Sequence, residues 1–186
     1  MPLNQATATI ARVSFGPAVI YLGVMGATPS TELGLIKNDD GVTIELTADK
    51  RDITDGNPKL IEYTFTQAQG AMLKFTGIQW NLFTSLWRGL GSGTTSSTGG
   101  HDKVNWGGDP LVSQCAIKVV HQMPVSGHTM NVYAWKCVPD APPKLAFTHD
   151  EHAFELAFKV QRSSTDWNGT SLAYNEQLFQ IDEQTA

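Results

Sequence analysis

The sequence predicts a mainly β fold with a single amphipathic α-helix lying across a sheet. Three observations predict it: short runs that alternate apolar and polar residues recur along the chain, only one segment has helical spacing, and only 17% of the residues are charged. The 186 residues suit a single domain spanning 1–186, large enough to bury a core without disulfides or metal.

The strands are expected in chain order. AVIYLGV (18–24) follows the breaker Gly16-Pro17 and is typical of a buried strand, while GVTIELT (41–47) and KLIEYTFTQ (59–67) each alternate and should pair as a hairpin. The polar stretch 48–58, with its Asp-Gly and Asn-Pro pairs, predicts a long exposed loop between them. Further strands are expected in AMLKFTGI, in LVSQCAIKVVHQ and MNVYAWKCV (the clearest hairpin), in FELAFKV and in the tail SLAYNEQLFQI.

One helix is expected, from Asn81 to Leu90. Asn81 is a suitable N-cap, and Gly91 can form the left-handed turn at the other end. The residues expected to pack this helix on the sheet are Leu82, Phe83, Leu86 and Trp87. The following Gly91–Gly100 segment contains only Gly, Ser and Thr, so residues 91–108 are expected to form a flexible loop.

Cys115 and Cys137 lie on the two strands of the clearest hairpin. A cross-strand disulfide is one reading, and a pair of buried thiols in a cytoplasmic protein is the favoured one. The N-terminus lacks the pattern of a signal peptide, and no apolar run approaches the roughly 20 residues of a membrane span. We therefore expect a soluble, non-secreted chain with no membrane partner.

The stretch THDEHAFELAFKVQR is the candidate for metal or acid–base chemistry. His149 and His152 stand beside Asp150 and Glu151, but residues three apart on a strand point to opposite faces, so a polar turn is the favoured reading. The sequence also lacks a Gly-x-Ser-x-Gly elbow and the lysine of a phosphate-binding loop. No enzyme activity, cofactor or metal is expected. The net charge of −5 argues against a protein that grips nucleic acid.

Few of the expected strands carry the prolines or inward-pointing charges that block sheet edges. Exposed edges pair with other strands, so ordered self-assembly is the expected use of such a chain.

The order of features resembles a known family. The segments that carry the resemblance are GPAVIYLGVMG, GVTIELTADKRDITDG, MLKFTGIQWNLFTSLWRGLG and the closing AFELAFKVQRSSTDWNG with NEQLFQI. Together they resemble the major tail tube protein of long-tailed, siphovirus-like bacteriophages, over nearly the whole chain. The GSGTTSSTGG insert departs from that family.

The resemblance implies an antiparallel β-sandwich or barrel with one flanking α-helix. It also implies a structural virion protein of the phage tail, assembled in the host cytoplasm. Its copies would form stacked hexameric rings whose strands close a shared barrel, through which double-stranded DNA passes transiently during ejection. Tape-measure, terminator and baseplate proteins would be its other partners. The strands around 42–47 and 59–66, and the hairpin 111–122 with 130–138, would line the lumen.

The resemblance also assigns roles to individual residues. Loop 48–58 would reach the adjacent ring, and the N-terminal arm, 1–16, would make further contacts. The inter-ring candidates in the loop are Asp49, Arg51, Asp52 and Asp55. Glu45 and Glu62, on the polar sides of their strands, are candidates for a lumen wall that gives a phosphate backbone no counterion release.

Other functions stay open at this point. A tail terminator or a baseplate ring protein would share the fold, and a β-sandwich carbohydrate-binding module would use an exposed Trp106, Trp135 or Trp167 as a sugar platform, although Trp135 is expected in the core. A metal-dependent hydrolase around His149 and His152 is the least favoured alternative.

Overall fold

The computed structural model describes residues 18–34, 36, 41–56, 59–78, 90–107, 112–123, 127–144 and 153–184. Within them the fold is mainly β, and the main sheet contains eight antiparallel strands in the order β2-β1-β7-β8-β9-β4-β3, with β10 also paired to β8. The strands are β1 (Ala18–Val24), β2 (Thr31–Glu32), β3 (Val42–Asp55), β4 (Leu60–Gly77), β7 (Cys115–Gln122), β8 (Thr129–Pro139), β9 (Phe154–Val160) and β10 (Gln180–Gln184).

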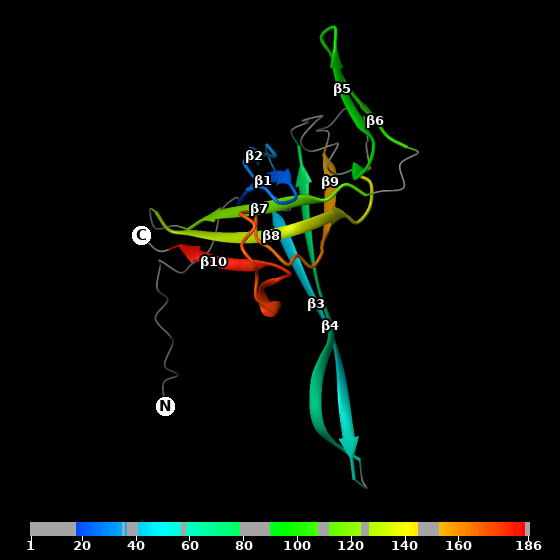
Figure 1. Ribbon diagram of the computed structural model, residues 1–186, viewed down its shortest axis with the longest axis vertical. Helices are drawn as coiled ribbons and strands as arrows, with labels where there is room; N and C mark the ends of the chain where they lie inside the picture. Colours follow the sequence, from blue (N-terminus) through cyan, green and yellow to red (C-terminus); the bar gives the residue numbers. More distant parts are fainter. Residues whose placement is uncertain are drawn as a thin grey trace, which may run out of the picture.

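Strand β8 holds the sheet together because it pairs with three other strands. β7 pairs with one edge of β8. On the opposite edge of β8, β10 pairs with residues 129–133 and β9 with residues 137–139. Figure 1 shows β7 and β8 running across the direction of β4 and β9. The described part of the sheet does not close on itself, since β2 and β3 lie at its two ends.

The core lies between these crossing parts of the sheet and is made by strand alternation. Strand β9 buries every second residue, from Phe154 to Val160, as its sequence predicts. The second half of β4 does the same, and the Phe75 and Phe158 rings stack with centroids 5.7 Å apart. A side chain on Gly77 would meet the Phe154 ring at 2.7 Å, so the ring packs directly on a bare stretch of backbone.

A second, smaller cluster lies on the other face of β7 and β8. Trp135 and Trp167 meet edge to face at 4.9 Å, and Trp135 Nε1 donates a hydrogen bond to the Glu176 carbonyl oxygen at 3.1 Å. The tail therefore covers the sheet before rejoining it.

The predicted strand SLAYNEQLFQI is wrong over most of its length. A 3-10 turn, Tyr174–Glu176, precedes β10, because Glu176 Oε2 accepts from the Ala173 N–H and closes a local turn.

The predicted loop 48–58 is also wrong. Strand β3 continues to Asp55, β4 starts at Leu60, and the two pair along their whole length, merging the predicted runs 59–67 and AMLKFTGI into one strand. Gly56, with φ of +89°, helps to turn the chain. The predicted pairing of the two runs is confirmed, but as a long, nearly continuous hairpin.

The expected flexible loop 91–108 is likewise replaced by a hairpin. Strands β5 (Thr94–Thr98) and β6 (His101–Asn105) pair around Gly99 and Gly100, both at positive φ. The Thr and Ser side chains of β5 suit a pleated ribbon, and the two glycines supply a tight turn. This hairpin and the free end of β3–β4 project from opposite ends of the molecule (Figure 1).

Three expectations fall outside the described residues: the helix with its packing residues Leu82, Phe83, Leu86 and Trp87, the N-terminal arm 1–16, and His149 with His152. Within the described part of the chain, no helix is long and apolar enough to cross a membrane.

Replacing Phe158 tests the core. Phe158 is fully buried, so Phe158→Ala should lower the free energy of unfolding by about 3–5 kcal/mol through lost burial and a residual cavity. Urea denaturation measures this loss. Lys159→Ala, at the next, exposed position of β9, is the control and should change stability by less than about 0.5 kcal/mol. Equal losses for the two variants would contradict this core.

Candidate assembly surfaces

The outer half of the β3–β4 hairpin has no core beneath it. We call residues 48–55 and 60–68 the hairpin arm; all of them are exposed, and within the described residues they pair only with each other. Strand β4 begins to pair with β9 only at Ala71. The arm therefore projects from the body as a two-stranded ribbon (Figure 1), a structure that is marginally stable when isolated in water.

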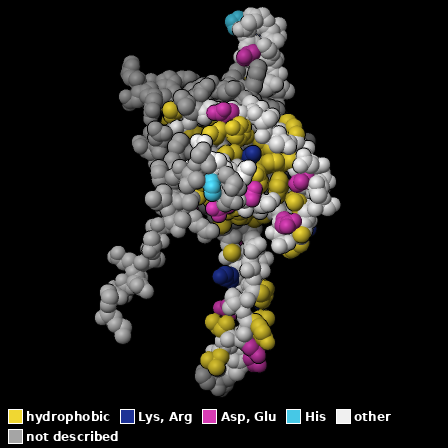
Figure 2. Space-filling view, turned by 90° about the vertical axis from the view of Figure 1, so that its left-hand side faces the viewer, with side chains coloured by type: hydrophobic (Ala, Val, Ile, Leu, Met, Phe, Trp, Pro, Cys, Tyr) yellow, Lys and Arg dark blue, Asp and Glu magenta, His cyan; other side chains and the backbone are white. Residues whose placement is uncertain are grey.

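The hairpin arm carries an exposed apolar surface. Ile53 lies opposite Tyr63, and Phe65 is two residues further along β4, so the three share one face. Near the tip, the consecutive residues Leu60 and Ile61 expose 68% and 63% of their surfaces, on opposite faces of the ribbon. Figure 2 shows these hydrophobic side chains interspersed with charged ones along the arm. Clustered exposed apolar side chains of this kind are typical of an interaction surface.

Two β-bulges interrupt the hairpin arm. Gln67 has no opposite residue between the pairs Asp49–Ala68 and Lys50–Thr66, and Glu62 has none between Ile53–Tyr63 and Thr54–Ile61. Bulges bend and twist a strand locally, so they direct the arm away from the plane of the sheet.

The four inter-ring candidates, Asp49, Arg51, Asp52 and Asp55, all lie on β3 within the hairpin arm and are exposed. Asp52 Oδ1 accepts from Thr64 Oγ1 at 2.6 Å across the two strands, and Asp55 Oδ1 accepts from the Gly56 N–H at 2.7 Å in the turn. These carboxylates therefore stabilise the ribbon locally. Their contact with an adjacent ring stays a prediction.

The two lumen candidates do not lie together. Glu45 sits at the base of the hairpin, opposite Met72, whereas Glu62 is the bulged residue near the tip, ten residues away along β4 or about 33 Å of extended chain. Glu45 Oε1 forms an ion pair with Lys74 Nζ at 2.9 Å. The hydrogen bond that Lys74 donates to Glu45 raises the pKa of Lys74, and the charges of Glu45, Glu155 and Asp140 act in the same direction.

The outward face of β3, β4 and β9 is polar and nearly neutral. A shallow hollow of about 310 Å³ on this face is lined by Thr43, Glu45, Lys74, Phe75, Thr76 and Glu155. Lys159 lies on the same face, on the exposed side of β9. This face thus carries two lysines and two glutamates, of which Lys74 and Glu45 form an ion pair.

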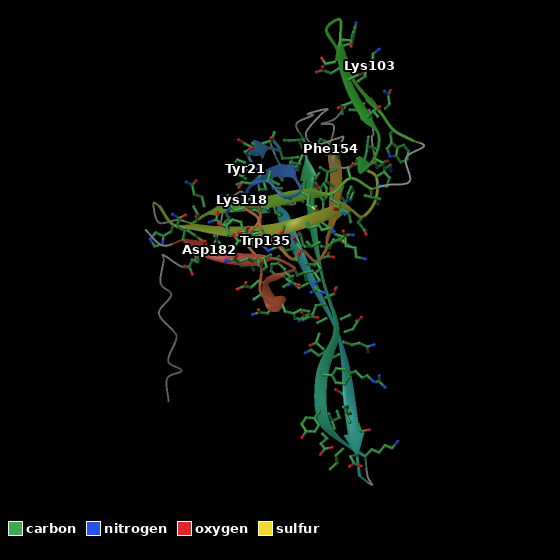
Figure 3. All side chains as sticks on the ribbon, in the orientation of Figure 1. Tyr21, Lys103, Lys118, Trp135, Phe154 and Asp182 are labelled. Atoms are coloured by element: carbon green, nitrogen blue, oxygen red, sulfur yellow. The ribbon has the colours of Figure 1, made fainter. Side chains whose placement is uncertain are left out.

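Two of the longer edges of the main sheet are open among the described residues, besides the edge of the two-residue strand β2. No described strand pairs with the outer edge of β3 or with the outer edge of β10. Figure 3 shows Asp182 of β10 at the end of the sheet that also carries Lys118. Lys118 Nζ lies 5.8 Å from the centre of the Tyr133 ring, and burial raises the pKa of Tyr133, as do the charge of Asp182 and its hydrogen bond.

Two of the three tryptophans that the carbohydrate-binding hypothesis needs on the surface are not exposed. Trp135 and Trp167 are buried, with 7% and 9% exposed, and only Trp106 is exposed, at 57%. This confirms the prediction that Trp135 is buried. A row of exposed aromatic rings is therefore not formed by these three residues.

The structure describes both cysteines, whereas His149 and His152 of the metal hypothesis lie outside the described residues. Cys115 and Cys137 are opposite each other across β7 and β8, both buried and both reduced, and burial raises the pKa of the Cys137 thiol well above its usual value. Within the described residues no three His, Cys, Asp or Glu side chains gather as a metal site.

The structure brings together one group of residues that the sequence does not single out. Arg162, which follows β9, lies over the Tyr174 ring at 5.0 Å, and its Nε donates to Gln177 Oε1. The three residues meet because the tail folds back over Trp135. No spacing in the sequence signals this contact.

The Tyr133–Asp182 contact makes a testable prediction. Because the folded state holds Tyr133 at a raised pKa, the phenol stabilises the fold below its unfolded pKa of about 10, and this stability is lost as pH rises through the folded value. Asp182→Asn should lower the Tyr133 pKa toward the value set by burial alone. Ultraviolet titration of tyrosinate measures it, with Tyr133→Phe identifying the signal, and an unchanged titration would exclude this contact.

The comparisons with known proteins identify no relative. No protein-family model matches the chain, and no curated protein matches it either. A functional conclusion therefore depends on the surfaces described above: a projecting apolar hairpin arm, two open sheet edges and a balanced polar face.

Proposed function

We propose that this chain is a structural subunit that assembles with identical copies into a tube, as the resemblance to phage tail tube proteins implies. The observation that carries the proposal is the hairpin arm, which exposes apolar side chains that no described residue covers. In the proposed tail, the rings are hexameric and stacked, and the tube conducts DNA during ejection.

The hairpin arm supports assembly on energetic grounds. Burying apolar surface is favourable by roughly 25 cal/mol per Å², so Ile53, Tyr63 and Phe65 gain stability when another copy covers them. The fold does not need these residues for its own core, to which β4 contributes only its second half, through Ala71, Leu73 and Phe75. Selection for a partner explains their exposure better than selection for the stability of the monomer.

The open edges support the same proposal. An unpaired edge offers a row of N–H and C=O groups, and closing strands into a ring removes it. The outer edge of β3 is 14 residues long, and that of β10 is five. Strand pairing between neighbouring copies would satisfy both edges.

The balanced polar face of β3, β4 and β9 suits a channel wall in this tube. A phosphate backbone binds where lysines and arginines neutralise it and release counterions. Here Lys74 is already paired with Glu45, so passing DNA meets no unpaired cation at that position. In this proposal Glu45 faces the lumen, and terminator, baseplate and tape-measure proteins are the further partners.

Electron microscopy of the purified protein tests the proposal. The wild-type chain should form long hollow tubes, and single rings would indicate a terminator or baseplate ring instead. The triple variant Ile53→Ser, Tyr63→Ser, Phe65→Ser should form no tubes while its circular dichroism is unchanged, because these side chains lie outside the core. Val24→Ser with Met25→Ser, exposed apolar residues away from the arm, is the control and should assemble.

Charge reversal tests the channel wall. Glu45→Lys should still allow tubes but slow or stall DNA ejection, because the added lysine holds the phosphate backbone. The rate of DNA release from particles carrying the variant measures this effect. Glu45→Gln, which adds no cation, is the control. Ejection at the wild-type rate in the lysine variant would remove Glu45 from the lumen.

A further inference from the structure

A hollow of about 400 Å³ lies at the base of the hairpin arm. Residues Thr66, Gln67, Ala68 and Gln69 of β4 form one wall, and Arg162, Tyr174, Gln177 and Leu178 of the C-terminal segment form the other. The bulged residue Gln67 is part of the first wall. The hollow therefore forms where the arm leaves the body and the tail folds back beside it.

The hollow presents a cation that is held in position. Arg162 donates one hydrogen bond, from Nε to Gln177, and its guanidinium group lies over the Tyr174 ring at 5.0 Å. A guanidinium has five N–H donors, so the remaining donors can bind a carboxylate. Among the described residues no carboxylate forms an ion pair with Arg162.

The hollow also presents apolar surface. Tyr174 is 82% exposed, the largest exposed fraction among the large hydrophobic and aromatic side chains described, and Leu178 lies beside it. A site that joins an arginine to an aromatic ring and an aliphatic side chain suits a segment carrying carboxylates next to apolar residues. Arginine and tyrosine are also the residue types enriched at the energetic centres of protein interfaces.

The tip of the hairpin arm has this chemistry. Between residues 52 and 62 it carries three carboxylates, Asp52, Asp55 and Glu62, against one ammonium group, Lys59, which gives a net charge of −2. Leu60 and Ile61 lie among these charges and are largely exposed. The charge and the apolar character of the tip thus complement those of the hollow.

The tip of the same copy cannot occupy the hollow. Eight residues of extended strand separate Ala68 in the hollow from Leu60 at the tip, about 27 Å. The occupant must come from another molecule. We propose that the hollow around Arg162 and Tyr174 receives the acidic, apolar tip of the hairpin arm of a second copy.

This inference rests on the proposed function and names the surface that accepts the arm. Donor and acceptor surfaces differ, so each copy can give its tip to one neighbour and receive the tip of another. A contact of this heterologous kind repeats without closing on a pair, as a growing tube requires.

Cysteine cross-linking tests the contact. Thr54→Cys places a thiol near the tip and keeps all three carboxylates, and Ala68→Cys places one in the hollow. When the two full-length variants are mixed and treated with a mild oxidant, a disulfide-linked dimer of one chain of each should form. Ser96→Cys on β5 is the matched control and should not cross-link to Thr54→Cys. The native cysteines are buried and present in every sample.

Charge reversal tests the role of Arg162. Arg162→Glu should weaken self-association by roughly tenfold or more, because it replaces attraction to the acidic tip by repulsion. Combining it with Asp55→Arg and Glu62→Arg should restore assembly in part. Sedimentation at matched concentrations measures both effects, with circular dichroism as the check that each variant folds.

The outcomes separate this inference from the proposed function. If wild-type tubes form but the tip cross-links to Ser96→Cys, or to neither position, the hollow is not the acceptor and the tube proposal stands. If tip and hollow cross-link only as reciprocal pairs and no tubes are seen, the contact is correct and the tube proposal falls. Wild-type assembly by the Arg162→Glu variant would also overturn the inference.

Discussion

The rest of the structure depends on the fact that β4 is longer than the core that supports it. From Ala71 to Gly77 the strand buries alternate residues against β9 and the strands that cross it, but before that point every residue is exposed. One strand thus serves two purposes. Its second half is part of the hydrophobic core, and its first half, with β3, forms a ribbon that has nothing in its own molecule to pack on.

The arrangement keeps the hydrophobic core separate from the projecting surface. The buried cluster draws on β1, β4, β7, β8 and β9, so the body can fold whether or not the hairpin arm is covered. Bulges at Gln67 and Glu62 interrupt the regular hydrogen bonding of the arm without touching that core. A surface that is displayed in this way can be altered for a partner at little cost to the stability of the body.

The pattern of apolar residues was enough to predict the strands that form the core. It did not predict strands whose residues are all exposed. β9 was predicted with nearly its observed bounds because its apolar residues recur every second position, and β1 because a continuous apolar run follows the breaker Gly16-Pro17. Residues 48–55 look like a loop in the sequence because they are polar and charged; they are a strand because cross-strand hydrogen bonds to β4 organise them, which periodicity of hydrophobicity does not report. The same reason hid the Ser- and Thr-rich β5–β6 hairpin. The hollow around Arg162 and Tyr174 was beyond prediction, since it depends on how the tail folds over Trp135.

The two projecting hairpins give the molecule a direction. The β3–β4 end is rich in exposed apolar and acidic side chains, whereas the β5–β6 end carries the hydroxyl-bearing side chains of β5 and the mostly polar ones of β6. Any polymer in which these subunits stack in one orientation has two chemically different ends. One end is apolar and acidic, and the other is hydrophilic. Subunits would then add to the two ends at different rates, and no single capping protein would bind both ends.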